Sequence, residues 1–246
     1  MSSYPIWDVK TTRELILSLY GKEHFLKANQ SLNSALQRRD FAKFHYFEAF
    51  DRWEAHLEDI KNEDPIEVVL LTCEDEIAND RRAQRMDELA AHVHSCVHSL
   101  HTIPDTLAHA LYYGLALNLS SPLKERKITA SSVAKKLDED SALTKLSDMF
   151  QSIYTSGDFT YIDALNNHGK HRSMVRPGTW FDMTGKATVP ITLEFSDFSY
   201  DTARYARREI QPVLSREYER ISKGVVDCGI EILNLLKERA LKPENT

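Results

Sequence analysis

The sequence of 246 residues has only three cysteines, Cys73, Cys96 and Cys228, which lie far apart along the chain. Their spacing does not resemble a zinc knuckle, in which cysteines come in close pairs. Each lies in an apolar helical pattern, which is typical of a reduced cysteine in a protein core. We therefore interpret the three residues as buried thiols of a cytoplasmic protein.

Long hydrophobic runs are also missing. No apolar stretch approaches the roughly 20 residues that a helix needs to span a bilayer. The longest candidate runs from Leu107 to Leu119 and is interrupted by polar side chains. The first residues have neither the cationic start nor the apolar run of a secretory signal. The sequence predicts no membrane segment and a cytoplasmic location.

Several motifs that mark common enzymes are absent. The chain has no glycine-rich phosphate loop, no Gly-x-Ser-x-Gly elbow and no Rossmann fingerprint. No internal repeat or low-complexity segment is present either. These absences exclude several enzyme plans, and we expect no cofactor.

Positive charge is in deficit over the whole chain. The formal net charge is −6 and the pI is about 5.9. A general nucleic-acid coat needs a basic surface, so this balance argues against one. It leaves room for a local basic site.

Most of the sequence has helical periodicity. Apolar side chains from Tyr46 to Ile60 recur at intervals of four and three residues, which predicts a helix packed against a core. The same alternation from Ile210 to Leu235 predicts a long last helix that serves as core or as a dimer seam. We expect a mainly α fold, an antiparallel multi-helix array. It would form one domain over residues 1–246, with a sub-division into residues 1–118 and 130–246.

Local signals place some of the helix boundaries. Asp64 followed by Pro65 is typical of a helix start. Gly21 predicts a kink or an end in the first helix. The polar run from Asn79 to Arg85 is either a short loop or an exposed turn of one long helix. Ser199 or Asp201 is expected to open the last helix, unless Pro212 marks its true start.

A short segment with a period of two follows the middle helices. Val189, Ile191, Leu193 and Phe195 alternate with polar residues or proline, as in a half-buried strand. Residues 174–181 are a candidate partner strand. The sequence therefore predicts one small β-hairpin near residues 174–195.

Histidines form a stripe on one predicted helix. His94, His98, His101 and Asp105 are separated by four, three and four residues, so they share one face of an uninterrupted helix. This spacing allows His94, His98 and His101 to bind one metal ion. However, Pro104 should kink or break the helix between His101 and Asp105, and no Glu-x-x-His pair accompanies the histidines. The alternative is a polar stripe that faces another helix, solvent or a subunit.

A basic and polar cluster lies between residues 166 and 172. It comprises Asn166, Asn167, His168, Lys170, His171 and Arg172. We expect a helix from about Phe159 that Gly169 weakens or ends, which would crowd these side chains at a helix terminus. Two imidazoles, two amides and two cations suit a phosphate or acid-base site. The alternative is a basic cap that satisfies the last helix carbonyls.

This late Asn-Asn-x-x-Lys-His-Arg cluster, followed by one more long helix, resembles the HEPN superfamily of all-α prokaryotic domains. Members are widespread in toxin-antitoxin and anti-phage defence systems, and many are metal-independent ribonucleases that act as dimers. Their catalytic motif is an Arg, often followed by a polar residue, with a His after four to six intervening residues. The resemblance assigns His171 to the histidine position and Asn167 to the polar position. The arginine position falls on Asn166, which is a departure from the motif.

The resemblance implies two functions. In the first, His171 is the general acid or base of a ribonuclease, Lys170 and Arg172 hold the phosphate, and Asn166 and Asn167 position the substrate. In the second, the protein is a non-enzymatic interaction or RNA-associated component of a defence system. It would then form a homodimer or bind a partner protein through its long helices. The acidic net charge and the missing arginine favour the second function. A helical metalloprotein on the histidine stripe is a third alternative.

Overall fold

The computed structural model describes residues 6–60, 76–120, 122–182, 184 and 191–241. Within these ranges the fold is mainly α with a small antiparallel β region, which confirms the expected fold class. The helix start expected at Asp64, as well as Cys73, lies outside the described residues. None of the described helices is long and apolar enough to cross a membrane.

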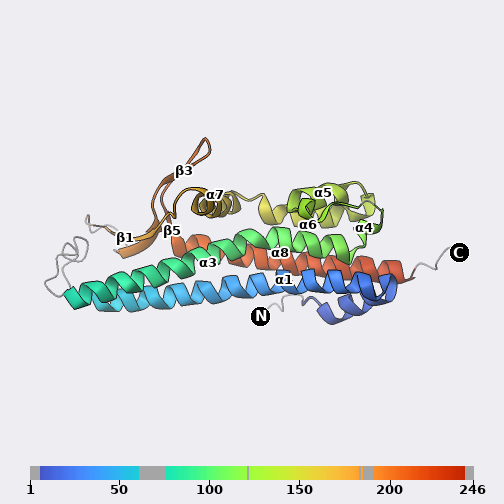
Figure 1. The fold of residues 1–246 in the computed structure, drawn as a ribbon, viewed down its shortest axis with the longest axis horizontal. Helices are drawn as coiled ribbons and strands as arrows, with labels where there is room; N and C mark the ends of the chain where they lie inside the picture. Colours follow the sequence, from blue (N-terminus) through green and yellow to red (C-terminus); the bar gives the residue numbers. More distant parts are fainter. Residues whose placement is uncertain (1–5, 61–75, 121, 183, 185–190, 242–246) are drawn as a thin grey trace. The chain divides into compact units, whose positions relative to one another are not determined.

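Three long helices dominate the described chain (Figure 1). These are α1 (Val9–Ile60), α3 (Glu76–Gly114) and α8 (Ile210–Leu241). The shorter helices are α4 (Leu117–Ser120), α5 (Ala130–Asp138), α6 (Thr144–Tyr154) and α7 (Gly157–His171), with 3-10 turns η1 (Glu125–Lys127) and η2 (Ser141–Leu143).

Local interactions explain where α1 begins and bends. The Asp8 side chain accepts a hydrogen bond from the Thr11 backbone N–H at 3.0 Å, which caps the first turn. Gly21 has φ 79° and ψ 175°, values outside the helical region, so two helical stretches meet there at a kink. The kink expected at Gly21 is confirmed.

α3 is longer and more regular than the sequence suggested. It runs through the polar segment from Asn79 to Arg85, so this segment belongs to one long helix and is not a loop. Pro104 lies inside the same helix, and helical structure continues on both sides of it. Of the two alternatives at Pro104, a break of the helix is therefore wrong. Pro104 is buried.

The β region contains the expected hairpin and further strands. β1 (Pro177–Phe181) pairs antiparallel with β2 (Ile191–Phe195), which confirms the hairpin. β5 (Arg208–Glu209) joins the other side of β2. A second hairpin pairs β3 (Phe198–Tyr200) with β4 (Ala203–Tyr205).

The expected start of the last helix at Ser199 or Asp201 is wrong. Both residues belong to the β3–β4 hairpin, where Asp201 takes a turn conformation with φ 52°. α8 begins at Ile210, and Pro212 lies in its first turn, where a missing backbone N–H costs no hydrogen bond. The alternative prediction, in which Pro212 marks the start of the last helix, was closer to the observed start at Ile210.

The contacts divide the chain into two compact units. Unit 1 comprises residues 1–40, 102–160 and 219–246, and unit 2 comprises residues 41–101 and 161–218. The long helices α1, α3 and α8 contribute to both units.

Two contacts with α8 stabilise unit 1. The Trp7 indole is buried and donates a hydrogen bond to Thr12 Oγ1 at 2.9 Å. It lies directly against Gly229 of α8, where any Cβ atom would overlap its ring. Arg220 of α8 donates to the carbonyls of Ser152 and Ile153, both at 2.6 Å, and thereby holds the end of α6.

In unit 2, segments of α1 and α3 run antiparallel. His45 contacts His92, while Arg52, further along α1, contacts Glu88, earlier in α3. Much of the apolar seam from Tyr46 to Ile60 is core, including Phe50, Trp53 and Ile60. This confirms the prediction that these side chains pack in the core.

The two described cysteines, Cys96 and Cys228, are free and buried. Burial raises the pKa of each thiol to about 12. A thiol with such a pKa stays protonated and is a poor nucleophile. These residues are therefore packing groups, as the sequence indicated.

Candidate functional site

The histidine stripe of α3 faces α7. His98 Nδ1 lies 3.1 Å from the Asn166 amide oxygen, and His101 Nε2 lies 2.9 Å from Asp163 Oδ1. Both pairs lie within unit 2. The polar stripe therefore faces another helix, which was the alternative to a metal site.

Asp163 connects two of these groups. Its Oδ1 also accepts a hydrogen bond from the Asn167 amide at 3.0 Å. Asp163 thus holds Asn167 on its own helix and His101 on α3. The amide of Asn167 is used inside this network, where it helps to fix α7 in place.

His94 has different surroundings from the other two stripe histidines. Its ring centroid lies 6.3 Å from that of Phe195 in β2. Burial lowers the pKa of His94 below its ordinary value of 6.5, although a hydrogen bond with the Val175 backbone acts in the opposite direction. His94 is therefore mainly neutral near pH 7 and packs as a core residue.

The three histidines do not form a ligand set. His98 and His101 each pair with a different α7 side chain, and His94 packs on Phe195. Across the described ranges, no three His, Cys, Asp or Glu side chains come together in a way that could hold a metal ion. The geometry gives no support to metal binding by His94, His98 and His101.

α7 carries the basic and polar cluster, and its boundaries differ from expectation. The Ser156 hydroxyl accepts from the Phe159 N–H at 3.0 Å and caps the helix start. Gly169 lies inside the helix, which continues to His171. The Arg172 N–H donates to the His168 carbonyl at 2.9 Å and closes the last turn. The expected end at Gly169 is wrong, because the contacts of α7 with α3 outweigh the low helix propensity of glycine.

The cluster separates into buried and exposed members. Asn166 is only 8% exposed, and its amide is directed to His98. The His168 ring bonds the Ser173 carbonyl at 2.5 Å, as the basic-cap interpretation expects. Lys170, His171 and Arg172 are exposed. These last three are the members most available to a large external ligand.

The β3–β4 hairpin packs beside the exposed end of α7. The Phe198 ring lies 5.5 Å from the His168 ring and stacks on Tyr205 at 4.9 Å. The Arg172 guanidinium lies 5.9 Å from the Tyr200 ring centroid, and its Nη1 donates to the Ser199 carbonyl at 3.4 Å. The hairpin therefore places a half-buried tyrosine ring next to a cation of α7.

Several arginines near the end of α7 form ion pairs with acidic side chains. Arg176 forms an ion pair with Asp87, and Arg204 forms one with Asp197. Arg207 pairs with Glu194 and lies 4.1 Å from the Trp180 ring. By contrast, within the described part of the chain, Lys170 and Arg172 at the end of α7 have no acidic partner.

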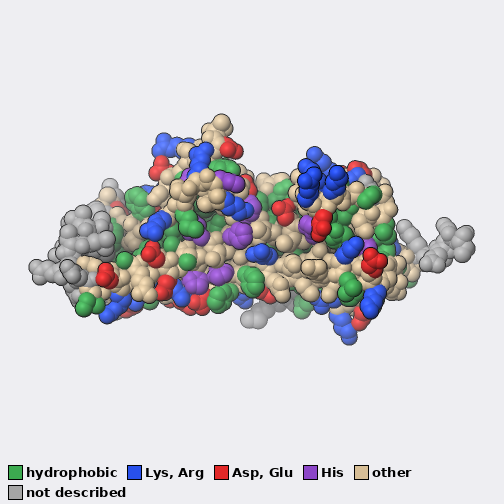
Figure 2. All heavy atoms as spheres, viewed as in Figure 1, with side chains coloured by type: hydrophobic (Ala, Val, Ile, Leu, Met, Phe, Trp, Pro, Cys, Tyr) green, Lys and Arg blue, Asp and Glu red, His purple; other side chains and the backbone are tan. Residues whose placement is uncertain are grey.

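We define the basic end of α7 as Lys170, His171 and Arg172, with Tyr200 beside them. On the face seen in Figure 2, Lys, Arg and His side chains gather over α7 and the β3–β4 hairpin. Another group of Lys and Arg side chains lies over α5. The basic end of α7 combines an arginine beside an aromatic ring with the lack of an acidic partner for that arginine among the described residues.

Sequence reasoning found the cations but missed Tyr200 and the network behind Asn166. Tyr200 lies in a three-residue strand that the sequence assigned to the last helix. Alternation of Phe198 and Tyr200 with polar residues was the available signal, but it is too short to distinguish a strand from a helix start.

A second histidine contact lies in unit 2, between α1 and α3. His45 Nδ1 and His92 Nδ1 are 3.0 Å apart. Burial, followed by repulsion from His92, lowers the pKa of His45. Burial, followed by repulsion from Arg52, lowers the pKa of His92, while Glu48 and Glu88 act in the opposite direction. The fold therefore favours the neutral form of both imidazoles.

This contact predicts that acid destabilises the protein. A histidine with a lowered pKa binds fewer protons in the folded state than in the unfolded state. Its contribution to the free energy of unfolding is therefore complete above about pH 6.5 and is lost as the pH falls through the folded pKa. We expect a lower melting temperature at about pH 5.5 than at about pH 7.5. The difference should shrink in the double variant His45→Gln, His92→Gln. In His171→Gln, which changes an exposed histidine, it should match the wild type. An equal difference in all three proteins would contradict the prediction.

Comparisons with protein families, with characterised proteins and with solved structures find no match to the chain. The resemblance to the HEPN superfamily therefore stays a prediction from the sequence. Function has to be argued from the residues and their geometry.

Proposed function

We propose that this protein is a HEPN-like, RNA-associated component that binds single-stranded RNA through the basic end of α7 without cleaving it. The observation that carries the proposal is the pair Lys170 and Arg172, exposed and without an acidic partner among the described residues, with Arg172 next to Tyr200. We place the protein in the cytoplasm, in a prokaryotic defence or toxin-antitoxin system, on the strength of the sequence resemblance.

The chemistry of this surface suits a nucleic-acid strand. Lys and Arg side chains bind phosphate oxygens and release counterions, which supplies most of the affinity of such contacts. Aromatic rings and guanidinium planes stack on unpaired bases. Arg172 and Tyr200 offer both surfaces at one place, and Lys170 adds a second fixed charge.

The position of Asn166 argues against cleavage. Its place in the family motif belongs to an arginine that would stabilise negative charge at the reacting phosphate. In this chain it is buried, uncharged and bonded to His98. His171 is exposed, and no hydrogen bond from a described residue orients its ring. The ribonuclease alternative, with His171 as general acid or base, lacks a second group held in position.

Binding and cleavage are tested together. A labelled RNA strand of about 20 nucleotides is titrated with the protein in EDTA, and its anisotropy is followed. Two phosphate contacts predict an affinity about sevenfold lower at about 200 mM than at about 50 mM salt. The RNA should remain intact on a gel. Absence of binding at low salt contradicts the proposal, and fragments that His171→Ala abolishes would establish the ribonuclease alternative.

A second candidate function is contact with another protein chain through α1. Phe41, Phe44 and Phe47 lie on this helix at intervals of three, and each is at least half exposed. Exposed aromatic residues in a group are typical of protein interfaces. We expect a homodimer or a partner complex through this face. Sedimentation velocity of the wild type should show a concentration-dependent dimer that Phe44→Ser, Phe47→Ser removes, whereas a monomer at every concentration contradicts the homodimer.

A further inference from the structure

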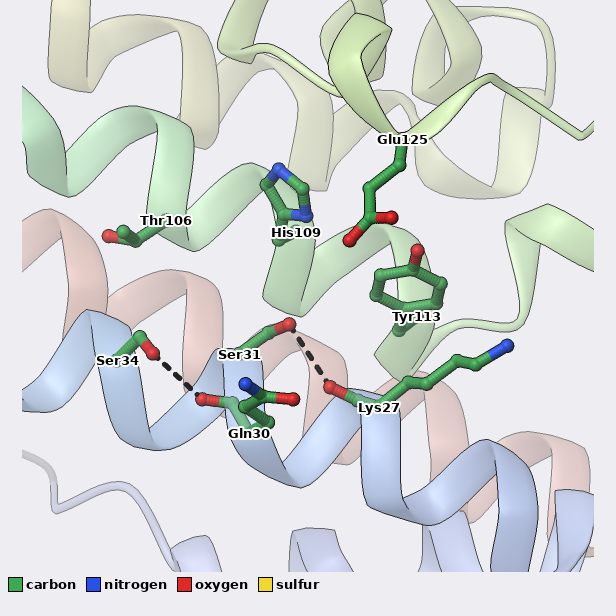
Figure 3. Close-up of a pocket in the computed structure, with 8 residues that line it drawn as sticks. All are labelled: Lys27, Gln30, Ser31, Ser34, Thr106, His109, Tyr113 and Glu125. Atoms are coloured by element: carbon green, nitrogen blue, oxygen red, sulfur yellow. Dashed lines mark hydrogen bonds between the residues drawn. The ribbon is translucent and has the colours of Figure 1, made fainter.

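Unit 1 contains a polar cavity that the proposed RNA surface does not use. Its volume is about 440 Å³, within the range of small-molecule sites. It lies between α1 and α3 and is bordered by η1 (Figure 3). The lining residues are Lys27, Gln30, Ser31 and Ser34 of α1, Thr106, His109 and Tyr113 of α3, and Glu125 of η1. Every one of them has a polar side chain, whereas most small-molecule sites are mainly apolar.

The hydroxyl groups of the lining act as acceptors toward the cavity. Ser31 donates its proton to the Lys27 carbonyl at 3.1 Å, and Ser34 donates to the Gln30 carbonyl at 3.0 Å. Thr106 donates to the carbonyls of its own helix at 3.0 and 3.1 Å. With their protons used in this way, the three oxygens offer lone pairs. A ligand that meets them must carry N–H or O–H donors.

Glu125 strengthens the same preference. Figure 3 shows its carboxylate directed toward His109 and Tyr113. No described residue forms a hydrogen bond or an ion pair with this carboxylate. Burial, followed by the charge of Glu125, raises the pKa of Tyr113 above its ordinary value of 10, so the phenol stays neutral. A carboxylate beside a tyrosine ring is the chemistry that binds an ammonium or guanidinium group.

Lys27 supplies the opposite charge. Its side chain extends from α1, on the opposite wall of the cavity from Glu125 (Figure 3). Its ammonium group has no acidic partner among the described residues. It can therefore bind an anionic group such as a carboxylate. The cavity lining thus carries a negative group from η1 and a positive group from α1, together with three hydroxyl acceptors.

We propose that this cavity binds a free basic amino acid, with the cationic side chain at Glu125 and Tyr113 and the α-carboxylate at Lys27. A guanidinium or ammonium group has only donors, which matches the acceptor-rich lining. A neutral sugar would leave both charges unpaired, and a simple dicarboxylate would bring negative charge to Glu125. The site goes beyond the RNA-binding function and does not depend on it.

Three related compounds test Glu125 and Lys27 separately by calorimetry with the full chain. L-arginine has both charged ends, citrulline lacks the guanidinium charge, and agmatine lacks the carboxylate. We expect L-arginine to bind with a dissociation constant below about 1 mM, and about tenfold more tightly than either analogue. Glu125→Gln should remove the preference over citrulline and keep the preference over agmatine. Lys27→Gln should do the reverse.

Lys124→Ala is the matched control, because it changes an exposed charge next to Glu125 outside the lining. It should bind all three compounds as the wild type does. The proposal is overturned if L-arginine gives no binding heat at about 5 mM. It is equally overturned if the wild type binds the three compounds alike, or if both preferences survive in Glu125→Gln and Lys27→Gln.

Discussion

The double variant Lys170→Ala, Arg172→Ala should bind single-stranded RNA about 30-fold more weakly than the wild type, a loss of roughly 2 kcal/mol. Each residue is exposed and has no acidic partner among the described residues, so each can give its full charge to a phosphate. The slope of log affinity against log salt should fall in magnitude by about 1.4. Anisotropy titrations at several salt concentrations measure both quantities.

Matched variants separate a local surface from general electrostatics. Lys124→Ala, Lys135→Ala also removes two exposed charges, but from unit 1, and should change the affinity by less than about twofold. Tyr200→Ala should cost about 1 kcal/mol through lost stacking, whereas Tyr200→Phe keeps the ring and should bind normally. Equal losses in both double variants would mean that RNA is held by charge alone and not by this surface.

Asn166→Ala should lower the free energy of unfolding by about 2 kcal/mol. The variant leaves a small cavity and removes the oxygen that lies 3.1 Å from the His98 ring nitrogen. Asn166 is nearly buried, so water replaces this hydrogen bond poorly. Urea denaturation measures the loss. The folded variant should bind RNA as the wild type does, because Asn166 is not part of the exposed surface.

Asn167→Ala is the natural control for this variant. Asn167 donates to Asp163 on its own helix and is more exposed, so its loss should cost less than about 1 kcal/mol. If Asn166→Ala left stability unchanged but abolished RNA binding, the amide would be a ligand contact. That result would contradict its assignment as a structural group between α3 and α7.

The sequence predicted features that depend on near neighbours. The helical seam around Phe50 and Trp53 and the hairpin of β1 and β2 follow from periods that a window of ten residues contains. The kink at Gly21 follows from the conformational freedom of one residue. In these cases local preference and the folded structure agree.

Features that depend on distant partners were not predictable. The spacing of His98 and His101 showed that they share a helix face, but their partners lie 68 and 62 residues away. No local pattern identifies an amide and a carboxylate at that separation. The glycine at 169 likewise stays helical because α7 is fixed by packing, which outweighs a propensity cost of about 1 kcal/mol.

Only part of the candidate site could be predicted from the sequence, because the rest depends on tertiary contacts. The cations at 170 and 172 stand out in an acidic chain. Which members of the cluster are exposed is decided by tertiary contacts, such as those of Asn166 with His98 and of His168 with the Ser173 carbonyl. Tyr200 lies beside Arg172 because of the β3–β4 hairpin, which the sequence did not predict.

The location of RNA on the protein is the most direct test of the account. Backbone amide resonances of the full chain can be followed by NMR while a short RNA strand is added. We predict that the largest shifts fall on Lys170, His171, Arg172 and Tyr200, with small shifts at Lys124 and Lys135 in unit 1. Shifts concentrated in unit 1, or none at all at the basic end of α7, would contradict the central claim.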